Sequence, residues 1–539
     1  MANLVTITKE DWINFFPYDE PRDYQVKAIN FALNEMINND KRFIILDCGT
    51  GVGKSAIGVT IARWYNNFVN GNGSYFITTQ KVLQEQYMKD FSKFGMKNLQ
   101  SANNFRCKYF KYKTCAESRL ELKVSDDAKF KQNCSHGCKY VSAKRDFIEG
   151  ELGITNFAYF MAETNYAGHL GKRTMLVVDE CHNTELQLSN FVEVSFSEFF
   201  AQSKLKIQPP KLDTSFQVVS WVTKDYLPEL KKLVDHYTVM ISKMGLNKDL
   251  KEFVQVSRQY DMLTKHLNKV ETFLKVFDKD NWVLNIIETE GKGKRKFEFK
   301  PIHVGPYSHE KLFNVADKVV LMSATVMNDS AFCEVLGINP NQTSYLHIPS
   351  PFPIENRPII ISGIGSMSYN NIDKTLPLLA EAIKAILAEH KGQKGIIHAN
   401  SYKIVSYLKK HIKDKRLLFH SAEDREKVLQ KHIDDPRPTV LVSPSMQEGV
   451  DLKGDLSEFQ IICKVPFPYL GDKLVKKRMN KWDWWYPLQT AKTIIQSVGR
   501  SIRNEEDKAI TYILDSDWNY YWSKNKDLFP KEFIDTVHN

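Results

Sequence analysis

The chain has 539 residues and 42% hydrophobic content, enough for two or three cores because a single core stops growing at roughly 250–300 residues. Lys and Arg total 74 against 64 Asp and Glu, and the net charge of +10 suits a polyanionic partner without requiring one. No apolar run is long enough to cross a bilayer, the N-terminus lacks the pattern of a secretory signal, and 8 Cys are too few for a disulfide framework. We therefore expect an intracellular protein with no membrane partner.

Short apolar runs alternate with helical patterns along the chain, which predicts parallel α/β structure. Two segments interrupt this alternation. Residues 101–150 are polar and Lys-rich, and residues 185–310 show apolar residues at helical spacing, with a basic turn leading into a strand-like stretch. We expect the second segment to be a mostly helical insertion. The predicted strands are residues 43–47, 74–79, 174–178, 319–325, 395–398, 439–443 and 459–463.

Residues 49–55 read GTGVGKS and stand between a predicted strand and a helix, which is the setting of a P-loop. Glycines let successive backbone N–H groups wrap the phosphates of a nucleotide. Lys54 is then expected to reach the β- and γ-phosphates, and the Ser55 hydroxyl to ligate Mg²⁺. The pattern departs from the usual one at Cys48, where a smaller residue is common, but the thiol is still compact.

Residues 175–182 read MLVVDECH, an apolar strand that ends in two acidic residues. P-loop chemistry needs such a partner. Asp179 is expected to hold Mg²⁺, mostly through water, and Glu180 to orient and deprotonate the attacking water. An exposed acidic pair is the plainer interpretation, but the four apolar residues directly before it disfavour that.

Residues 496–503 read QSVGRSIR, and we expect them to be helical. Gln496, Arg500 and Arg503 then share one face and present two guanidinium groups to one anion. An arginine that reaches the γ-phosphate accelerates P-loop hydrolysis by roughly 10³–10⁵. Because these arginines lie far beyond the P-loop in sequence, ATP is expected in a cleft between two lobes that closes and opens with each cycle.

Four of the cysteines, Cys107, Cys115, Cys134 and Cys138, fall within one short window. Clustered cysteines in a reducing compartment indicate a metal centre. A four-cysteine set holds either Zn²⁺ or an iron–sulphur cluster. The two tight Cys-x-x-Cys pairs of zinc ribbons are missing, but spacing alone leaves both groups open.

Single-strand binding without sequence preference uses basic groups for phosphates and aromatic rings for base stacking. Polar residues follow the predicted strand at 74–79, aromatic and basic residues flank Cys107, and lysines precede a group of tryptophans near residue 484. The plainer interpretation is that the aromatic residues belong to the core and the lysines to a solvated face, which is the more common situation for both residue types. The nucleic-acid candidates are Thr78, Thr79, Gln80, Tyr109, Lys477 and Trp484.

The order of these motifs resembles that of superfamily 2 helicases of the iron–sulphur type, the XPD/DinG group, over nearly the whole chain. Two positions depart from the family pattern: Cys181 replaces Ala in the DEAH-type box, and Phe157 replaces His in ITNFAYFMAE. Any one short motif is weak, whereas all of them in order are specific. The motifs are FFPYDEPRDYQ at 15–25, FITTQKVLQEQ at 76–86, DECH at 179–182, FKPIHVGPYSHEKLF at 299–313, SAT at 323–325, SPFPIENR at 350–357, GIIHANSY at 395–402, SMQEGVDLKGD at 445–455, PFPYLGD at 466–472 and QSVGRSIRNEED at 496–507.

The resemblance implies an α/β fold of two RecA-like P-loop domains, with an iron–sulphur insertion and a mostly helical arch insertion in the first. It also favours a [4Fe–4S] cluster over Zn²⁺ at the four cysteines. The implied divisions are residues 1–100, 151–188 and 313–332 for the first helicase domain, 101–150 for the cluster domain, 189–312 for the arch and 333–539 for the second helicase domain.

The resemblance implies an ATP- and Mg²⁺-dependent DNA helicase of DNA repair or replication, a monomeric motor moving 5′ to 3′ on single-stranded and forked DNA. A prokaryotic or viral member would work in the cytoplasm or nucleoid. A translocase that remodels complexes without unwinding, and an RNA helicase, remain alternatives. The expected ATP contacts are Arg22, Gln25, Gly49, Thr50, Gly51, Val52, Gly53, Lys54, Ser55 and Asp451.

Overall fold

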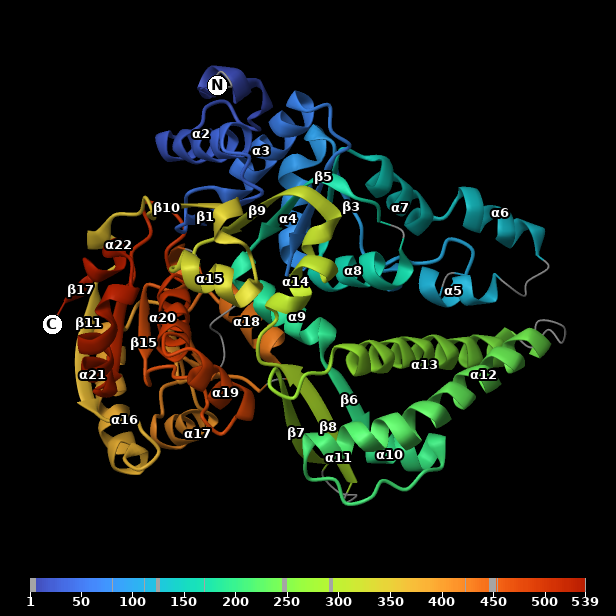
Figure 1. Cartoon of the computed structure of the whole chain (residues 1–539). Coiled ribbons are helices and arrows are strands. Elements are labelled where there is room, and N and C mark those ends of the chain that lie inside the picture. Colours follow the sequence, from blue (N-terminus) through green and yellow to red (C-terminus); the bar gives the residue numbers. More distant parts are fainter. Residues whose placement is uncertain are drawn as a thin grey trace.

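Two seven-stranded parallel sheets form the centres of two lobes, and two insertions extend from the first lobe (Figure 1). The computed structural model describes residues 6–79, 81–110, 112–122, 127–168, 170–244, 250–289, 294–421, 423–444, 452 and 454–538.

The first sheet has the order β10-β1-β9-β5-β2-β4-β3. Its central strands are buried along their whole length, as expected for a parallel sheet covered on both faces. Helices α2 (Asp23–Asn38) and α3 (Lys54–Phe68) contribute to the core on one face, and α8 (Phe157–Ala162) and α15 (Asp329–Leu336) to the core on the other. The strands are β1 (Phe43–Cys48), β2 (Ser74–Thr78), β3 (Met96–Asn98), β4 (Leu152–Asn156), β5 (Arg173–Asp179), β9 (Ala316–Ser323) and β10 (Thr343–Ile348).

The first lobe extends further along the chain than expected. β10 pairs with β1 in parallel register and forms an edge of the first sheet. The expected boundary at residue 333 is therefore too early, since the last strand of the first lobe ends at Ile348. The segment after β10 crosses to the second lobe.

The second sheet has the order β13-β14-β12-β15-β16-β11-β17. Helices α16 (Ile372–Glu389) and α17 (Tyr402–His411) contribute to the core on one face, and α20 (Trp485–Val498) and α21 (Asp517–Asn525) to a second core. The strands are β11 (Ile359–Gly365), β12 (Gly395–His398), β13 (Leu417–Phe419), β14 (Val440–Ser443), β15 (Phe459–Ile462), β16 (Ile510–Asp515) and β17 (Val537–His538), and α18 (Arg425–Asp434), α19 (Lys473–Lys481) and α22 (Lys531–Ile534) complete the lobe.

The larger insertion combines helices with a small antiparallel sheet, β6-β8-β7. Helix α13 is where the apolar spacing predicts one, and β8 is the strand-like stretch after the basic turn. The sheet and the helices share one core, so the region has a β-component that helical spacing alone does not reveal. Its elements are β6 (Val194–Ser197), α10 (Glu198–Phe200), α11 (Ser215–Trp221), α12 (Leu227–Met244), α13 (Leu250–Val276), β7 (Trp282–Thr289) and β8 (Lys294–Pro301).

The cysteine-bearing insertion consists of α5 (Cys115–Glu121), α6 (Ala128–His136) and α7 (Lys139–Glu149). It lies beside α13 of the other insertion (Figure 1), and Arg258 of α13 forms an ion pair with Glu117 of α5 at 2.6 Å. Among the described helices none combines the length and apolar character needed to span a bilayer.

Candidate nucleotide-binding site

The turn after β1 has the backbone of a phosphate-binding loop. Gly51 and Gly53 both adopt left-handed conformations, with φ of 91° and 81°, and α3 begins directly after them at Lys54. A Cβ on Gly51 would overlap the Phe352 ring. The glycines in GTGVGKS are therefore required both by backbone conformation and by the close approach of neighbouring groups. The N-terminus of α3 adds its own N–H groups and dipole to an anion site here.

Two segments hold this loop in place. The Gln25 amide donates to the carbonyl of Val52 at 3.0 Å and accepts the backbone N–H of Arg22 at 3.0 Å. The Arg22 guanidinium donates to the carbonyl of Gly51 at 3.3 Å. On the other side, the Ser350 hydroxyl donates to the carbonyl of Thr50 at 2.8 Å. The segment that leaves β10 for the second lobe thus touches the loop directly.

The acidic pair lies at the end of β5, separated from β1 in the sheet only by β9. Asp179 is buried, and burial together with Glu180 raises its pKa to about 6. Burial alone would raise the pKa of Glu180 as well, but the Lys54 ammonium and a hydrogen bond with His182 outweigh it, and this pKa falls to about 2. The two carboxylates therefore differ in their surroundings, and the Lys54 charge has its larger effect on Glu180. Its backbone is left-handed, with φ of 52°, a conformation uncommon outside glycine.

A chain of side-chain contacts runs from Glu180 to the second lobe. The His182 ring nitrogen Nδ1 lies 3.3 Å from Glu180 Oε2 and 2.7 Å from the Ser323 hydroxyl. Ser323 contacts Thr325 at 3.4 Å, and Gln496 of α20 donates to Thr325 at 3.4 Å. The sequence contained a signal for this series of contacts, because DECH follows one predicted strand and SAT ends another. The residues His182, Ser323 and Thr325 are nevertheless not among the expected site residues.

The two arginines are not on a helix, contrary to the expectation from QSVGRSIR. Helix α20 ends at Val498, so Gln496 lies in its last turn while Arg500 and Arg503 follow in a loop. Two contacts, one from a distant residue and one from a nearby residue, account for the difference. The Gln460 amide of β15 donates to the carbonyl of Val498 at 2.8 Å, and the Asp507 carboxylate accepts the backbone N–H of Arg503 at 2.7 Å.

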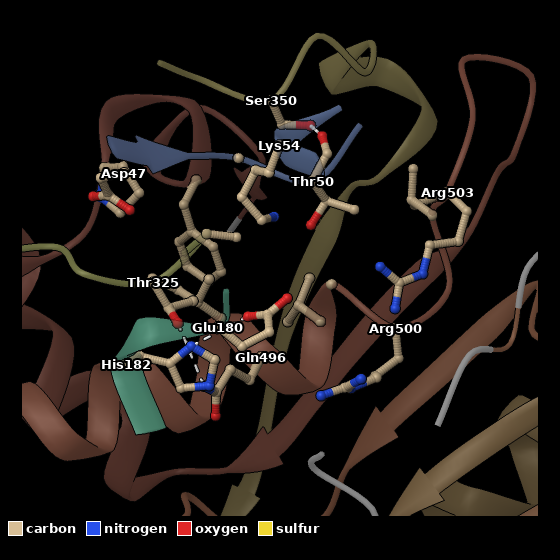
Figure 2. Close-up of a pocket in the computed structure, with 18 of the residues that line it drawn as sticks. Asp47, Thr50, Lys54, Glu180, His182, Thr325, Ser350, Gln496, Arg500 and Arg503 are labelled. Atoms are coloured by element: carbon tan, nitrogen blue, oxygen red, sulfur yellow. Dashed lines mark hydrogen bonds and ion pairs between the residues drawn. The ribbon is translucent and has the colours of Figure 1, made fainter. Parts of the chain in front are cut away.

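Residues of both lobes line one cavity of about 450 Å³. Lys54, Thr50 and Glu180 line it from the first lobe (Figure 2). Arg500 and Arg503 line it from the second lobe, and the Arg500 charge contributes to lowering the pKa of Glu180. Asp451 lies outside the described residues.

The four cysteines come from neighbouring elements of the smaller insertion. Cys115 Sγ and Cys138 Sγ are 3.4 Å apart, and burial followed by this contact raises the pKa of Cys115 to about 12. Burial, with Cys138 and Cys107 nearby, raises the pKa of Cys134 to about 11. Within the described residues no three His, Cys, Asp or Glu side chains are arranged as metal ligands. Thiolates are the donor type that both Zn²⁺ and iron–sulphur clusters take, so the residue types present suit either group.

The nucleic-acid candidates do not converge on one surface. Thr78 is buried, Thr79 lines the cavity, and Gln80 lies outside the described residues. The Tyr109 hydroxyl hydrogen-bonds Asp127 in the cysteine insertion, far from α19 in Figure 1. On the second lobe, Lys477 of α19 is exposed.

Trp484 has a partly buried ring next to the first-lobe core. It stacks on Trp482 with ring centroids 5.6 Å apart, and both rings pack with that core. The plainer interpretation of this tryptophan as a packing residue therefore has direct support.

Two family models match the chain. One is described as Type III restriction enzyme, res subunit, and matches residues 19–207; the other is described as Helicase C-terminal domain and matches residues 384–535. The first range contains the P-loop, the acidic pair and the four cysteines, and the second contains both arginines. The two matches therefore divide between the two lobes.

The chain is similar to ATP-dependent DNA helicase YoaA of Haemophilus influenzae, at 24% identity over 275 residues that cover 48% of this chain and 42% of the relative. It is 28% identical to ATP-dependent DNA helicase DinG of Photobacterium profundum over 249 residues, 42% of this chain and 35% of the relative. The matches span less than half the length of these relatives. A solved structure named XPD_Helicase superposes with a TM-score of 0.62 at 18% identity, covering 95% of this chain and 98% of the other. This likeness confirms the fold of two RecA-like lobes.

Proposed function

Because the chain is of the XPD/DinG type among superfamily 2 helicases, we propose that it is an ATP hydrolase that works as a DNA helicase. The cavity between the lobes is the observation that carries this proposal. Lys54 and Glu180 from one lobe, and Arg500 and Arg503 from the other, line the same space. A nucleotide bound there would contact both lobes, so its hydrolysis would change how they sit against each other.

Each residue at the first-lobe side has a proposed role in hydrolysis. The Lys54 ammonium and the backbone N–H groups of residues 49–55 would bind the β- and γ-phosphates, with Arg22 and Gln25 supporting that loop. Ser55 and Asp179 would hold Mg²⁺, which neutralises phosphate charge when bound. Glu180 would orient the attacking water and accept its proton.

The second-lobe side would complete the site only when the lobes are close. Arg500 and Arg503 would stabilise the charge on the transferred γ-phosphate. Gln496 would connect this side of the cavity to Thr325 of the first lobe through its hydrogen bond. Repeated closure and opening would move a monomeric motor along single-stranded DNA, 5′ to 3′ by kinship with the family. Lys477, exposed on α19, is a proposed phosphate contact.

We further propose that residues 101–150 form a cluster domain in which Cys107, Cys115, Cys134 and Cys138 hold a [4Fe–4S] cluster, with Zn²⁺ as the alternative. The shared neighbourhood of the four thiols supports this. Protein purified without air should be brown, with broad visible absorbance that reduction or chelation removes. A colourless preparation that contains zinc and no iron would overturn the cluster.

Unwinding of tailed duplexes tests the function most directly. Substrates with a 5′ or a 3′ tail, as DNA and as RNA, should be compared with and without ATP. The proposal expects ATP-dependent displacement from the 5′-tailed DNA substrate. Strand-stimulated ATP hydrolysis without displacement from any substrate would instead identify a translocase, and displacement of RNA alone would identify an RNA helicase.

A further inference from the structure

Helix α4 (Lys81–Phe91) forms one wall of the nucleotide cavity. Val82, Leu83 and Gln86 of this helix line the cavity. Tyr87 follows them and points into the first-lobe core, where it is 1% exposed. Its ring packs between Phe76 and Phe91, with centroid separations of 5.9 and 5.5 Å. This packing fixes the ring and therefore also determines the position of its hydroxyl group.

That hydroxyl ends between the two proposed Mg²⁺ ligands. Tyr87 Oη donates to Asp179 Oδ2 at 3.0 Å, and Ser55 lies close enough to the same phenol to influence its pKa. Asp179 Oδ1 accepts the backbone N–H of Glu180 at 3.0 Å, so each carboxylate oxygen has a defined partner.

We propose that Tyr87 is a positioning residue that holds the Asp179 carboxylate in place beside Ser55 for Mg²⁺. The inference rests on the proposed function, because it concerns the metal of that ATP site. Ser55 lies in the first turn of α3 and Asp179 ends β5, so a hydrogen bond from α4 to Asp179 fixes where this carboxylate lies relative to α3. A hydroxyl held by a packed ring does this at little entropic cost. Helix α4 begins two residues after Thr79, and the Tyr87 hydrogen bond connects this helix to a proposed metal ligand.

A simpler interpretation makes Tyr87 a core aromatic whose hydroxyl is satisfied by the nearest carboxylate. The two interpretations differ in what removal of the hydroxyl does. A packing role predicts a change in stability alone, whereas a positioning role predicts a change in the dependence of nucleotide binding on Mg²⁺. Tyr87→Phe removes the hydroxyl and keeps the ring.

The test measures ADP affinity of the full chain by calorimetry, once with Mg²⁺ and once with EDTA. The ratio of the two dissociation constants gives the contribution of Mg²⁺. In Tyr87→Phe this ratio should fall about tenfold, the size of one hydrogen bond to a charged group, while affinity in EDTA is unchanged. Tyr75→Phe is the matched control, because Tyr75 is also buried in the first lobe and its hydroxyl donates to the carbonyl of Gly171 at 2.8 Å.

Three results would overturn the inference. The first is a Mg²⁺ ratio in Tyr87→Phe equal to that of Tyr75→Phe. The second is an equal loss of ADP affinity with Mg²⁺ and with EDTA, which would indicate a structural role only. The third is a wild-type chain that binds ADP equally well in both conditions, because Mg²⁺ then makes no contribution that Tyr87 could support. A wild-type chain that binds no ADP in either condition would instead overturn the proposed ATP site itself.

Discussion

The two sides of the nucleotide cavity are built in different ways. On the first lobe, the P-loop and the acidic pair follow β1 and β5, strands separated only by β9, so the sheet itself brings Lys54 and Glu180 together. On the second lobe, Arg500 and Arg503 lie in a loop beyond α20, where Gln460 and Asp507 side chains hydrogen-bond the backbone. The first side is fixed by backbone pairing and the second by a few side chains, which suits a part that must move relative to the other.

The largest effect should come from the first-lobe side. Glu180→Gln keeps the size and packing of the side chain but removes the proposed base, so ATP turnover should fall about 10⁴-fold. Lys54→Ala should act as strongly because it removes the phosphate contact. Steady-state phosphate release measures the effect, and an unchanged unfolding temperature and retained ATP binding by Glu180→Gln are the controls. Full turnover in either variant would contradict the assigned site.

Removal of the second-lobe arginines should have the next largest effect. Arg500→Ala and Arg503→Ala should each lower turnover about 10³-fold with ATP binding largely kept, since the guanidinium groups are proposed to act on the transition state. Arg437→Ala is a matched control on the same lobe, because Arg437 is exposed and pairs with Asp435. Loss of ATP binding without loss of maximal turnover would assign the arginines to ground-state binding instead.

The sequence predicted the first side of the cavity better than the second. Residues 43–47 and 174–178 match strands β1 and β5 closely, because a doubly covered parallel strand needs a continuous apolar run and a P-loop needs glycines. The end of α20 was not predictable, since the contact that helps to end it comes from Gln460, 38 residues earlier in the chain. The hydroxyl of Tyr87 was missed for the same reason: its partner Asp179 lies 92 residues away.

A smaller effect should follow from a substitution that weakens the loop carrying Arg500 and Arg503 while both arginines are kept. The Asp507 carboxylate accepts the backbone N–H groups of both Arg503 and Asn504, and it is 7% exposed. Asp507→Ala leaves both N–H groups unpaired, so turnover should fall about tenfold while ATP affinity is kept. Glu506→Ala is the control, because Glu506 is the neighbouring residue and is exposed. Equal turnover in the two variants would show that the loop holds its shape without Asp507.

The smallest effect concerns a direct ionic contact between the lobes. His347 of β10 lies 3.3 Å from Asp47 of β1 and 3.1 Å from Glu532 of α22, and hydrogen bonds to both carboxylates raise its pKa to about 10. Tyr345 also contacts Asp47, and the Arg357 charge lies near Glu532. The ring is partly exposed, so solvent screening keeps its contribution to stability small.

The pH dependence of this contact has a definite sign. A histidine whose pKa is raised from about 6.5 in the unfolded chain stabilises the fold fully below that value and loses the contribution as pH rises toward 10. His347→Gln should therefore lower the unfolding temperature by about 1–2 °C at pH 6, and the difference should nearly vanish at pH 10. Thermal unfolding of both proteins at pH 6, 8 and 10 measures this. A difference that stays constant across this range would mean that His347 joins the lobes by packing and neutral hydrogen bonds, with no contribution from its charge.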